Sequence, residues 1–209
     1  MKKKKILLLD IDYTVIHTDS MREFFIYAII KKPVKLILNL PYVFSVLIMY
    51  ILRLASIERA KEAIYYAIKY FEEDELNEFF ERKLIPKINT CMKKLILDYK
   101  KDGNPVIMIT ASPYAYMKYF ESYDMADKVI GTELECIGSK YKNKILGKNC
   151  KKSEKVKRLN EYLEKESFEI DYENSYAFSD SKSDLDMLSL VKNAYYVNKS
   201  DGEIKEIVN

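Results

Sequence analysis

The stretch Ile6-Leu7-Leu8-Leu9-Asp10-Ile11-Asp12-Tyr13-Thr14 decides what kind of fold this chain adopts. Four apolar residues of strand length run directly into two carboxylates. If the chain turns just after Asp10, both carboxylates converge at the carboxyl edge of a sheet. Open α/β sheets bind their ligands at that edge. A carboxylate that attacks phosphorus, beside another that moves a proton, would supply much of the chemistry of a phosphatase.

The composition limits the class of protein. A length of 209 residues suits one domain, or a core domain with a modest insertion, and 48% hydrophobic residues are ample for a core. The net charge of +3 is too small to indicate a nucleic-acid partner. Three cysteines at irregular spacings and a single histidine predict neither a zinc site nor a disulfide framework, so we expect a reducing, cytoplasmic location.

Four apolar runs of strand length recur along the chain and alternate with helical stretches. They are Ile6–Leu9, Val106–Ile109, Tyr176–Phe178 and Ala194–Val197. Such alternation predicts an α/β fold, a Rossmann-like doubly wound parallel sheet with helices on both faces. Two hydroxyl residues look like helix N-caps. Ser112 precedes Pro113, and Ser153 precedes the helical pattern over 154–166.

Residues 21–99 interrupt the alternation with helical periodicity and no convincing strand. This block is too long for a simple crossover connection. We therefore expect a helical cap at 21–99, inserted into a catalytic core formed by 1–20 and 100–209. Later, Thr132–Ile137 and Tyr141–Ile145 predict a β-hairpin at the edge of the core.

Candidate partners for the two aspartates follow the later strands. Thr110 ends a strand and could hydrogen-bond a phosphate together with backbone N–H groups. Asp180 and Asp184 lie at a strand end and in the next turn, where carboxylate oxygens suit Mg²⁺. Asp186 is an alternative to Asp184, although its offset favours a surface role.

The motif Asp10-x-Asp12-x-Thr14 resembles the opening motif of the haloacid dehalogenase-like hydrolase superfamily. Thr110, the segment Asn149–Val156 and the segment Phe178–Leu185 resemble its three later motifs, in order. In the lysine-bearing segment Lys155 occupies the matching place, with Lys151 and Lys152 as competitors. The helical insertion is most similar to the subgroup that contains phosphoserine phosphatase.

This resemblance implies a Mg²⁺-dependent phosphomonoester hydrolase that forms an aspartyl-phosphate. Asp10 would be the nucleophile and Asp12 the acid and base. Asp10, Asp180 and the Asp12 carbonyl would hold Mg²⁺, with Asp184 in or just outside its coordination shell. The phosphate would be bound by Tyr13, Thr14, Thr110, Ala111 and Lys155. Two positions depart from the family pattern, because Tyr13 replaces the usual glycine and Ser183 a frequent asparagine.

The cap leaves several substrates open. Leu36–Leu52 has no formal charge and is flanked by basic residues. It predicts either buried cap helices or an apolar surface that rests on a membrane and reaches a lipid phosphate, and a transmembrane span is not favoured. A phosphoserine substrate would need Asp19 or Glu23 with Arg53 or Arg59. The alternative to an enzyme is a phosphate-binding or regulatory module on the same fold.

Overall fold

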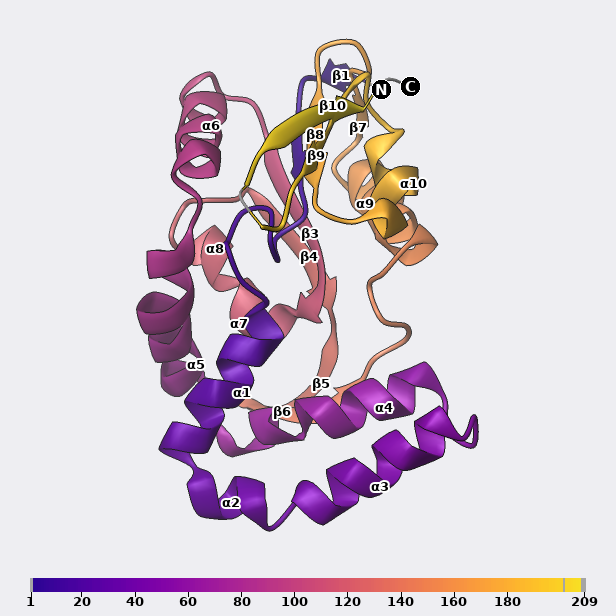
Figure 1. Ribbon diagram of the computed structural model, residues 1–209. Coiled ribbons are helices and arrows are strands. Elements are labelled where there is room, and N and C mark those ends of the chain that lie inside the picture. Colours follow the sequence, from indigo (N-terminus) through magenta and orange to yellow (C-terminus); the bar gives the residue numbers. More distant parts are fainter. Residues whose placement is uncertain (1, 201, 208–209) are drawn as a thin grey trace.

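The core is a twisted, mostly parallel sheet. The computed structural model describes residues 2–200 and 202–207. Its main sheet has six strands in the order β10-β9-β8-β2-β3-β4, all neighbours parallel except the β10–β9 pair (Figure 1). The strands are β2 (Leu7–Leu9), β3 (Val106–Pro113), β4 (Lys128–Thr132), β8 (Tyr176–Ser179), β9 (Asn193–Val197) and β10 (Ile204–Ile207).

The side chains of β2 belong to two separate hydrophobic clusters, because successive residues of a strand point to opposite faces of the sheet. Leu7 and Leu9 are buried with the cap and with α6 (Thr90–Lys101). Leu8 is buried on the other face with α9 (Ser153–Lys165). Both faces of the sheet are covered, which confirms the predicted doubly wound α/β fold.

Helices between β2 and α6 form the cap, at the lower end of the molecule in Figure 1. They are α1 (Ser20–Lys31), α2 (Pro33–Ile37), α3 (Leu40–Ile51), α4 (Ile57–Ile64), a 3₁₀ segment (Tyr65–Tyr70), α5 (Glu73–Phe79), a π-helical turn (Phe80–Leu84) and a second 3₁₀ turn (Ile85–Lys87). Asp19 and Ser56 cap α1 and α4 by accepting hydrogen bonds from Arg22 N and Arg59 N. α6, which contains residues 90–99 of the stretch 21–99 expected to form the cap, packs on β3.

Shorter elements complete the chain. They are β1 (Lys2–Lys4), α7 (Tyr114–Met117), α8 (Tyr119–Ser122), β5 (Leu134–Ile137), β6 (Lys140–Ile145), β7 (Phe168–Ile170), a 3₁₀ turn (Lys182–Asp184) and α10 (Leu185–Leu188). β1 and β7 form a separate parallel pair.

The β5–β6 hairpin is present, but it lies against the cap, not free at the edge of the core. Asn143 Nδ2 donates to the Glu62 carbonyl, and the Ile145 N–H donates to the Glu62 carboxylate. The hairpin, which follows β4 in the chain, therefore links α4 of the cap to the main sheet.

Both predicted N-caps in the core were wrong. Ser112 and Pro113 are the last residues of β3, and the next helix begins at Tyr114. Ser153 is the first residue of α9, whose N-cap position is Lys152. The Ser112 side chain, which a local cap would have used, instead makes the tertiary contact described below.

Candidate active site

The carboxyl ends of three adjacent strands bring the predicted residues together. In the parallel register Leu9 of β2 pairs with Met108 of β3 and with Phe178 of β8. Asp10 follows Leu9 directly, and Asp180 follows β8. β3 shifts register between Ile109 and Pro113, which is the stretch that carries Thr110. Irregular strand ends of this kind re-aim side chains next to binding sites.

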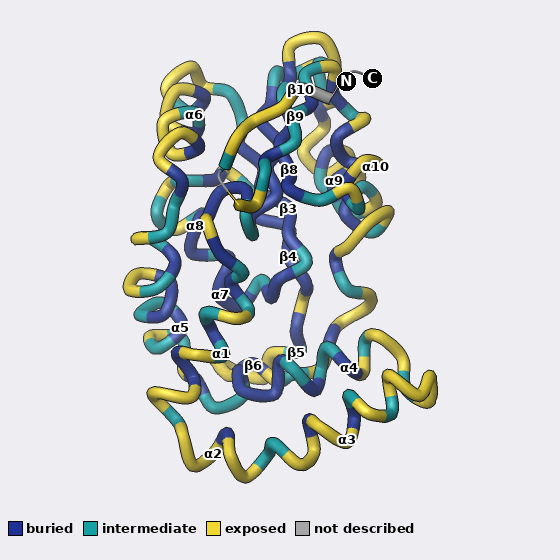
Figure 2. The backbone as a smooth tube through the Cα atoms, in the orientation of Figure 1, coloured by how far each residue is buried: buried dark blue, intermediate teal, exposed yellow. Residues whose placement is uncertain are grey.

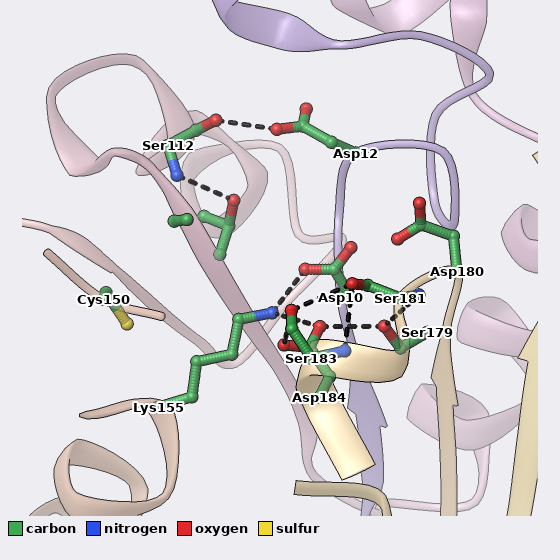
Figure 3. A network of polar contacts seen from close by, with 12 residues as sticks. Asp10, Asp12, Ser112, Cys150, Lys155, Ser179, Asp180, Ser181, Ser183 and Asp184 are labelled. Carbon is green, nitrogen blue, oxygen red and sulfur yellow. Dashed lines mark hydrogen bonds and ion pairs between the residues drawn. The ribbon is translucent and has the colours of Figure 1, made fainter. Parts of the chain in front are cut away.

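Lys155 reaches from the start of α9 to two carboxylates (Figure 3). Its Nζ lies 2.5 Å from Asp10 Oδ1 and 2.7 Å from Asp184 Oδ2. All three side chains are buried. Ser179 Oγ donates a further hydrogen bond of 2.8 Å to Asp184 Oδ2. One buried ammonium thus holds the predicted nucleophile and one predicted metal ligand in place.

Burial sets the protonation behaviour of this cluster. It raises the pKa of Asp10, and the nearby charge of Asp184 raises it further, while Lys155 opposes both effects. Burial alone would lower the pKa of Lys155, but the charges of Asp10 and Asp184 raise it above its usual value. Lys155 therefore stays cationic, as a group that balances phosphoryl charge must.

Two serines hold Asp12 apart from this cluster, and Figure 3 shows one of them, Ser112. Ser112 Oγ donates to Asp12 Oδ2 at 2.7 Å, and the backbone N–H of Ser20 donates to Asp12 Oδ1 at 2.9 Å. Burial raises the pKa of Asp12 to about 6, although both serine hydrogen bonds oppose the shift. A carboxylic acid with a pKa near neutrality is suited to giving and taking a proton.

Asp180 has a cationic partner of its own. Lys199 Nζ, in the exposed segment after β9, lies 2.7 Å from Asp180 Oδ2. The same ammonium lies 5.1 Å from the centre of the Tyr13 ring. Tyr13 has φ = 58°, in the left-handed region that favours glycine. Glycine would adopt this backbone without strain, so the tyrosine that stands where the resemblance leads one to expect glycine is a strained residue at the site.

The backbone N–H of Tyr13, predicted to contact phosphate, donates instead to the Thr18 carbonyl at 3.2 Å. Thr14 is buried beside the site and does not line its cavity. Thr110 Oγ1 accepts from the Ser112 N–H at 3.1 Å. The carbonyl of Ala111 accepts from Thr132 Oγ1. Tyr13 thus lines the cavity while its N–H is bonded within its own loop, and Thr14 lies outside the lining of the cavity.

The other predicted residues share one cavity of about 160 Å³. Those that line it are Asp10, Asp12, Tyr13, Thr110, Ala111, Lys155, Asp180 and Asp184, together with Asp19, Lys151, Ser181, Ser183 and Lys199. The sequence analysis missed the roles of Ser112 and Lys199. Ser112 stands two residues after Thr110, so its position in the motif was a usable signal, whereas nothing local distinguishes Lys199 from other surface lysines.

The oxygen donors of the site suit a hard divalent cation that completes its coordination with other ligands. Asp10, Asp180 and Asp184 present only oxygen atoms to the cavity, and Lys155 supplies one charge between two carboxylates. Within the described ranges no three Asp, Glu, His or Cys side chains are gathered as a ready-made metal cluster. Mg²⁺ commonly uses one or two carboxylates and fills its shell with water and substrate oxygens, so the residues present fit it.

Known proteins resemble this chain in sequence and in fold. The chain is 29% identical over 132 residues to a histidinol-phosphatase of Neisseria meningitidis serogroup C (strain 8013), an alignment that covers 62% of this chain and 59% of that protein. The chain thus spans about three fifths of that relative.

Solved structures share the fold. A protein of unknown function from Bordetella pertussis Tohama I has a TM-score of 0.73 at 19% identity, covering 92% of this chain and 89% of that one. A substrate-bound phosphoserine phosphatase complex has a TM-score of 0.62 at 16% identity, covering 93% and 86%. The family model of the haloacid dehalogenase-like hydrolases matches residues 7–189. The chain belongs to the haloacid dehalogenase-like hydrolases.

Proposed function

We propose that this protein is a Mg²⁺-dependent phosphomonoester hydrolase that works through an aspartyl-phosphate on Asp10. One observation carries the proposal. The Asp10 carboxylate is buried at the carboxyl edge of the sheet, 2.5 Å from the Lys155 ammonium, in a cavity that it shares with Asp12 and Thr110. A nucleophile, a proton carrier and a positive charge thus surround one space where a phosphoryl group can sit.

The two aspartates have separate roles in the proposed reaction. A carboxylate oxygen of Asp10 attacks phosphorus, so that one Asp10 O–P bond forms as the bond to the leaving alkoxide breaks. Asp12 gives its proton to that alkoxide. Asp12 then removes a proton from water, which attacks phosphorus and releases inorganic phosphate and free Asp10. Ser112 and Ser20 keep the Asp12 carboxyl oriented through both steps.

Asp10, Asp180 and Asp184 would hold Mg²⁺, which when bound supplies a positive charge for the phosphoryl oxygens. Lys155 balances charge on Asp10, and Thr110 lies where its hydroxyl can meet a phosphoryl oxygen. Phosphoryl transfer depends mainly on such positioning and electrostatics.

Release of phosphate from p-nitrophenyl phosphate, with Mg²⁺ and with EDTA, tests this function. We expect turnover that requires Mg²⁺ and that Asp10→Asn abolishes, because uncatalysed phosphomonoester hydrolysis is extremely slow. If the wild-type protein binds phosphate but shows no Mg²⁺-dependent turnover, the regulatory-module alternative replaces the proposal. Turnover by a folded, metal-clean Asp10→Asn protein would mean that another residue is the nucleophile.

The residues around the site do not favour phosphoserine as substrate. Among the four residues proposed to hold an amino acid, only Asp19 lines the cavity. Arg53 and Arg59 are exposed, and Glu23 binds Thr18 and Lys87. The acid–base pairs expected from the sequence to hold the ammonium and carboxylate of phosphoserine are therefore not assembled at this cavity.

A membrane-surface enzyme is a second candidate, favoured by the outer face of the cap. Pro33–Ile51 has a mean hydropathy of 1.9 and is long and apolar enough to cross a membrane by length and composition. Only 17% of an 18-residue window within this stretch is buried, however. In the structure this stretch is two helices, α2 and α3, most of whose backbone trace is coloured as exposed in Figure 2. Several of its apolar side chains are exposed. They include Ile37 at 63%, Leu38 at 74% and Ile51 at 76% exposure.

Apolar contact, more than charge, would hold this face on a cytoplasmic membrane surface. Lys31 and Lys32 are ion-paired with Glu78 and Glu75, so part of the basic flank is already neutralised. Flotation with anionic phosphatidylglycerol vesicles tests the idea. We expect binding that Leu38→Glu with Ile51→Glu abolishes, while a matched Leu97→Glu change on α6 leaves it intact. Absence of wild-type binding at low salt would exclude the membrane version.

A further inference from the structure

A second cavity lies beside the phosphate site, between α1 and α3. It has a volume of about 420 Å³, within the range of about 300–1,000 Å³ that is typical of ligand pockets. Its wall is mostly apolar and includes Phe25, Leu40, Val43, Phe44, Leu47 and Tyr66. The phosphatase chemistry described above makes no use of this space.

The two cavities share part of their walls. Tyr13 and Asp19 line both of them. A molecule whose phosphate lies beside Asp10 can therefore extend past the Tyr13 ring into the apolar space. Asp12, the proposed proton donor, lines the polar cavity together with Tyr13, so the leaving group that it protonates lies near the shared wall.

The apolar cavity is a groove open to solvent at the surface of the cap, not a void in a packed core. Here Val43 is buried but Leu40 and Leu47 are only half-buried, and Phe44 is exposed. α3 thus keeps apolar side chains next to an open space that no side chain of the described residues fills. Each methylene group of a bound molecule that enters this space is removed from water, which favours binding.

Tyr13 stands where the two cavities meet, because it lines both of them. Its backbone lies in the left-handed region, with φ = 58°, which glycine would adopt without strain. Strained residues of this kind cluster at functional sites.

We infer that the cavity between α1 and α3 is a subsite for an unbranched apolar chain on the leaving group, so that the substrate class is long-chain alkyl or lipid-like phosphomonoesters. The inference rests on the proposed phosphatase function and adds the substrate class. Tyr13 is a specificity-determining residue that separates the polar phosphate site from the apolar subsite.

A series of straight-chain monoalkyl phosphates tests this subsite without a membrane. Propyl, hexyl and decyl phosphate have chemically similar leaving groups, and each is used below the concentration at which it forms micelles. We expect kcat/KM to rise about fourfold per methylene group until the cavity is full, from about 0.8 kcal/mol per buried CH₂. Equal kcat/KM for propyl and decyl phosphate would overturn the inference and leave the phosphatase function standing.

Filling the cavity is the second arm. Leu47→Trp places a larger side chain on the apolar wall and should bring the decyl-to-propyl ratio of kcat/KM close to one. Leu97→Trp makes the same change at an exposed position of α6 and should keep the wild-type ratio. A Leu47→Trp protein that keeps the full wild-type ratio would also contradict the inference.

Calorimetric binding of propylphosphonate and decylphosphonate separates the two proposals, because phosphonates are not hydrolysed. If no alkyl phosphate is turned over but decylphosphonate binds at least about tenfold more tightly, and Leu47→Trp removes that preference, the catalytic proposal fails and the chain subsite stands. Equal affinity for the two phosphonates refutes the subsite whatever the activity.

Discussion

The Lys155 ammonium lies 2.5 Å from the Asp10 carboxylate, although 145 positions separate the two residues in the sequence. Both side chains are buried, and Asp184 accepts from the same ammonium at 2.7 Å. Removal of a buried partner is costly because it leaves an uncompensated charge. The contact therefore makes stability and the proposed chemistry depend on one lysine.

Replacing that lysine should impair both properties. We expect Lys155→Met to lower the free energy of unfolding by about 3–5 kcal/mol, because two buried carboxylates lose their cation. Its kcat should fall at least about 10²-fold, the usual cost of losing one charge-stabilising donor. Urea unfolding and p-nitrophenyl phosphate turnover measure the two effects. Lys157→Met, an exposed change on the same helix, should alter neither one. Wild-type turnover in Lys155→Met would remove Lys155 from the site.

Loss of the Ser112 hydroxyl should shift the pH profile. Its hydrogen bond holds down the pKa of Asp12, so Ser112→Ala should raise that pKa. A hydrogen bond to a charged group is worth about 1.5–3 kcal/mol, and one pKa unit corresponds to about 1.4 kcal/mol. We expect the Asp12-dependent limb of the kcat/KM profile to move up by about one unit. Ser122→Ala, at an exposed serine, is the control, and an unmoved limb in Ser112→Ala would contradict this role.

Protein stability should also report the Asp12 pKa. Its folded value of about 6 lies above its usual value of 3.8, so between these values the folded state binds more protons than the unfolded state. This contribution to stability is fully present below pH 3.8 and is lost as the pH rises through 6. Urea unfolding at pH 4 to 7 should show a smaller decline for Asp12→Asn than for wild type. The same decline in both proteins would be inconsistent with the shifted pKa, and Asp186→Asn, at an exposed carboxylate, is the control.

The strained backbone at Tyr13 predicts an unusual rank order of variants. Tyr13→Gly and Tyr13→Ala both remove the ring, but only glycine is relaxed at φ = 58°. We expect Tyr13→Gly to be more stable than Tyr13→Ala by about 1 kcal/mol in urea unfolding. The same pair of changes at Asp124, with φ = 54°, measures the backbone effect away from the site. A Tyr13→Ala protein as stable as Tyr13→Gly would show that the site is unstrained.

Local patterns were enough to locate most of the site. Asp10, Thr110 and Asp180 each stand at the end of an apolar run, and parallel strands place such ends at one edge. Lys155 was identified by its likeness to a family motif, and the structure brings it to Asp10. The roles of Ser112 and Lys199 were missed, because a serine before proline reads locally as a helix cap and an exposed lysine carries no local signal.

Strand-length apolar runs and their polar ends are local properties of the chain, so the sequence alone was enough to predict the doubly wound α/β core and the carboxylates at its edge, whereas Lys155 was predicted through its likeness to a family motif. Only the tertiary structure decided which side chains face one another. It paired Lys155 with two carboxylates, placed the β5–β6 hairpin on the cap, and opened an apolar cavity between α1 and α3 beside Tyr13. Such arrangements depend on packing between residues far apart in the chain, which no local pattern encodes.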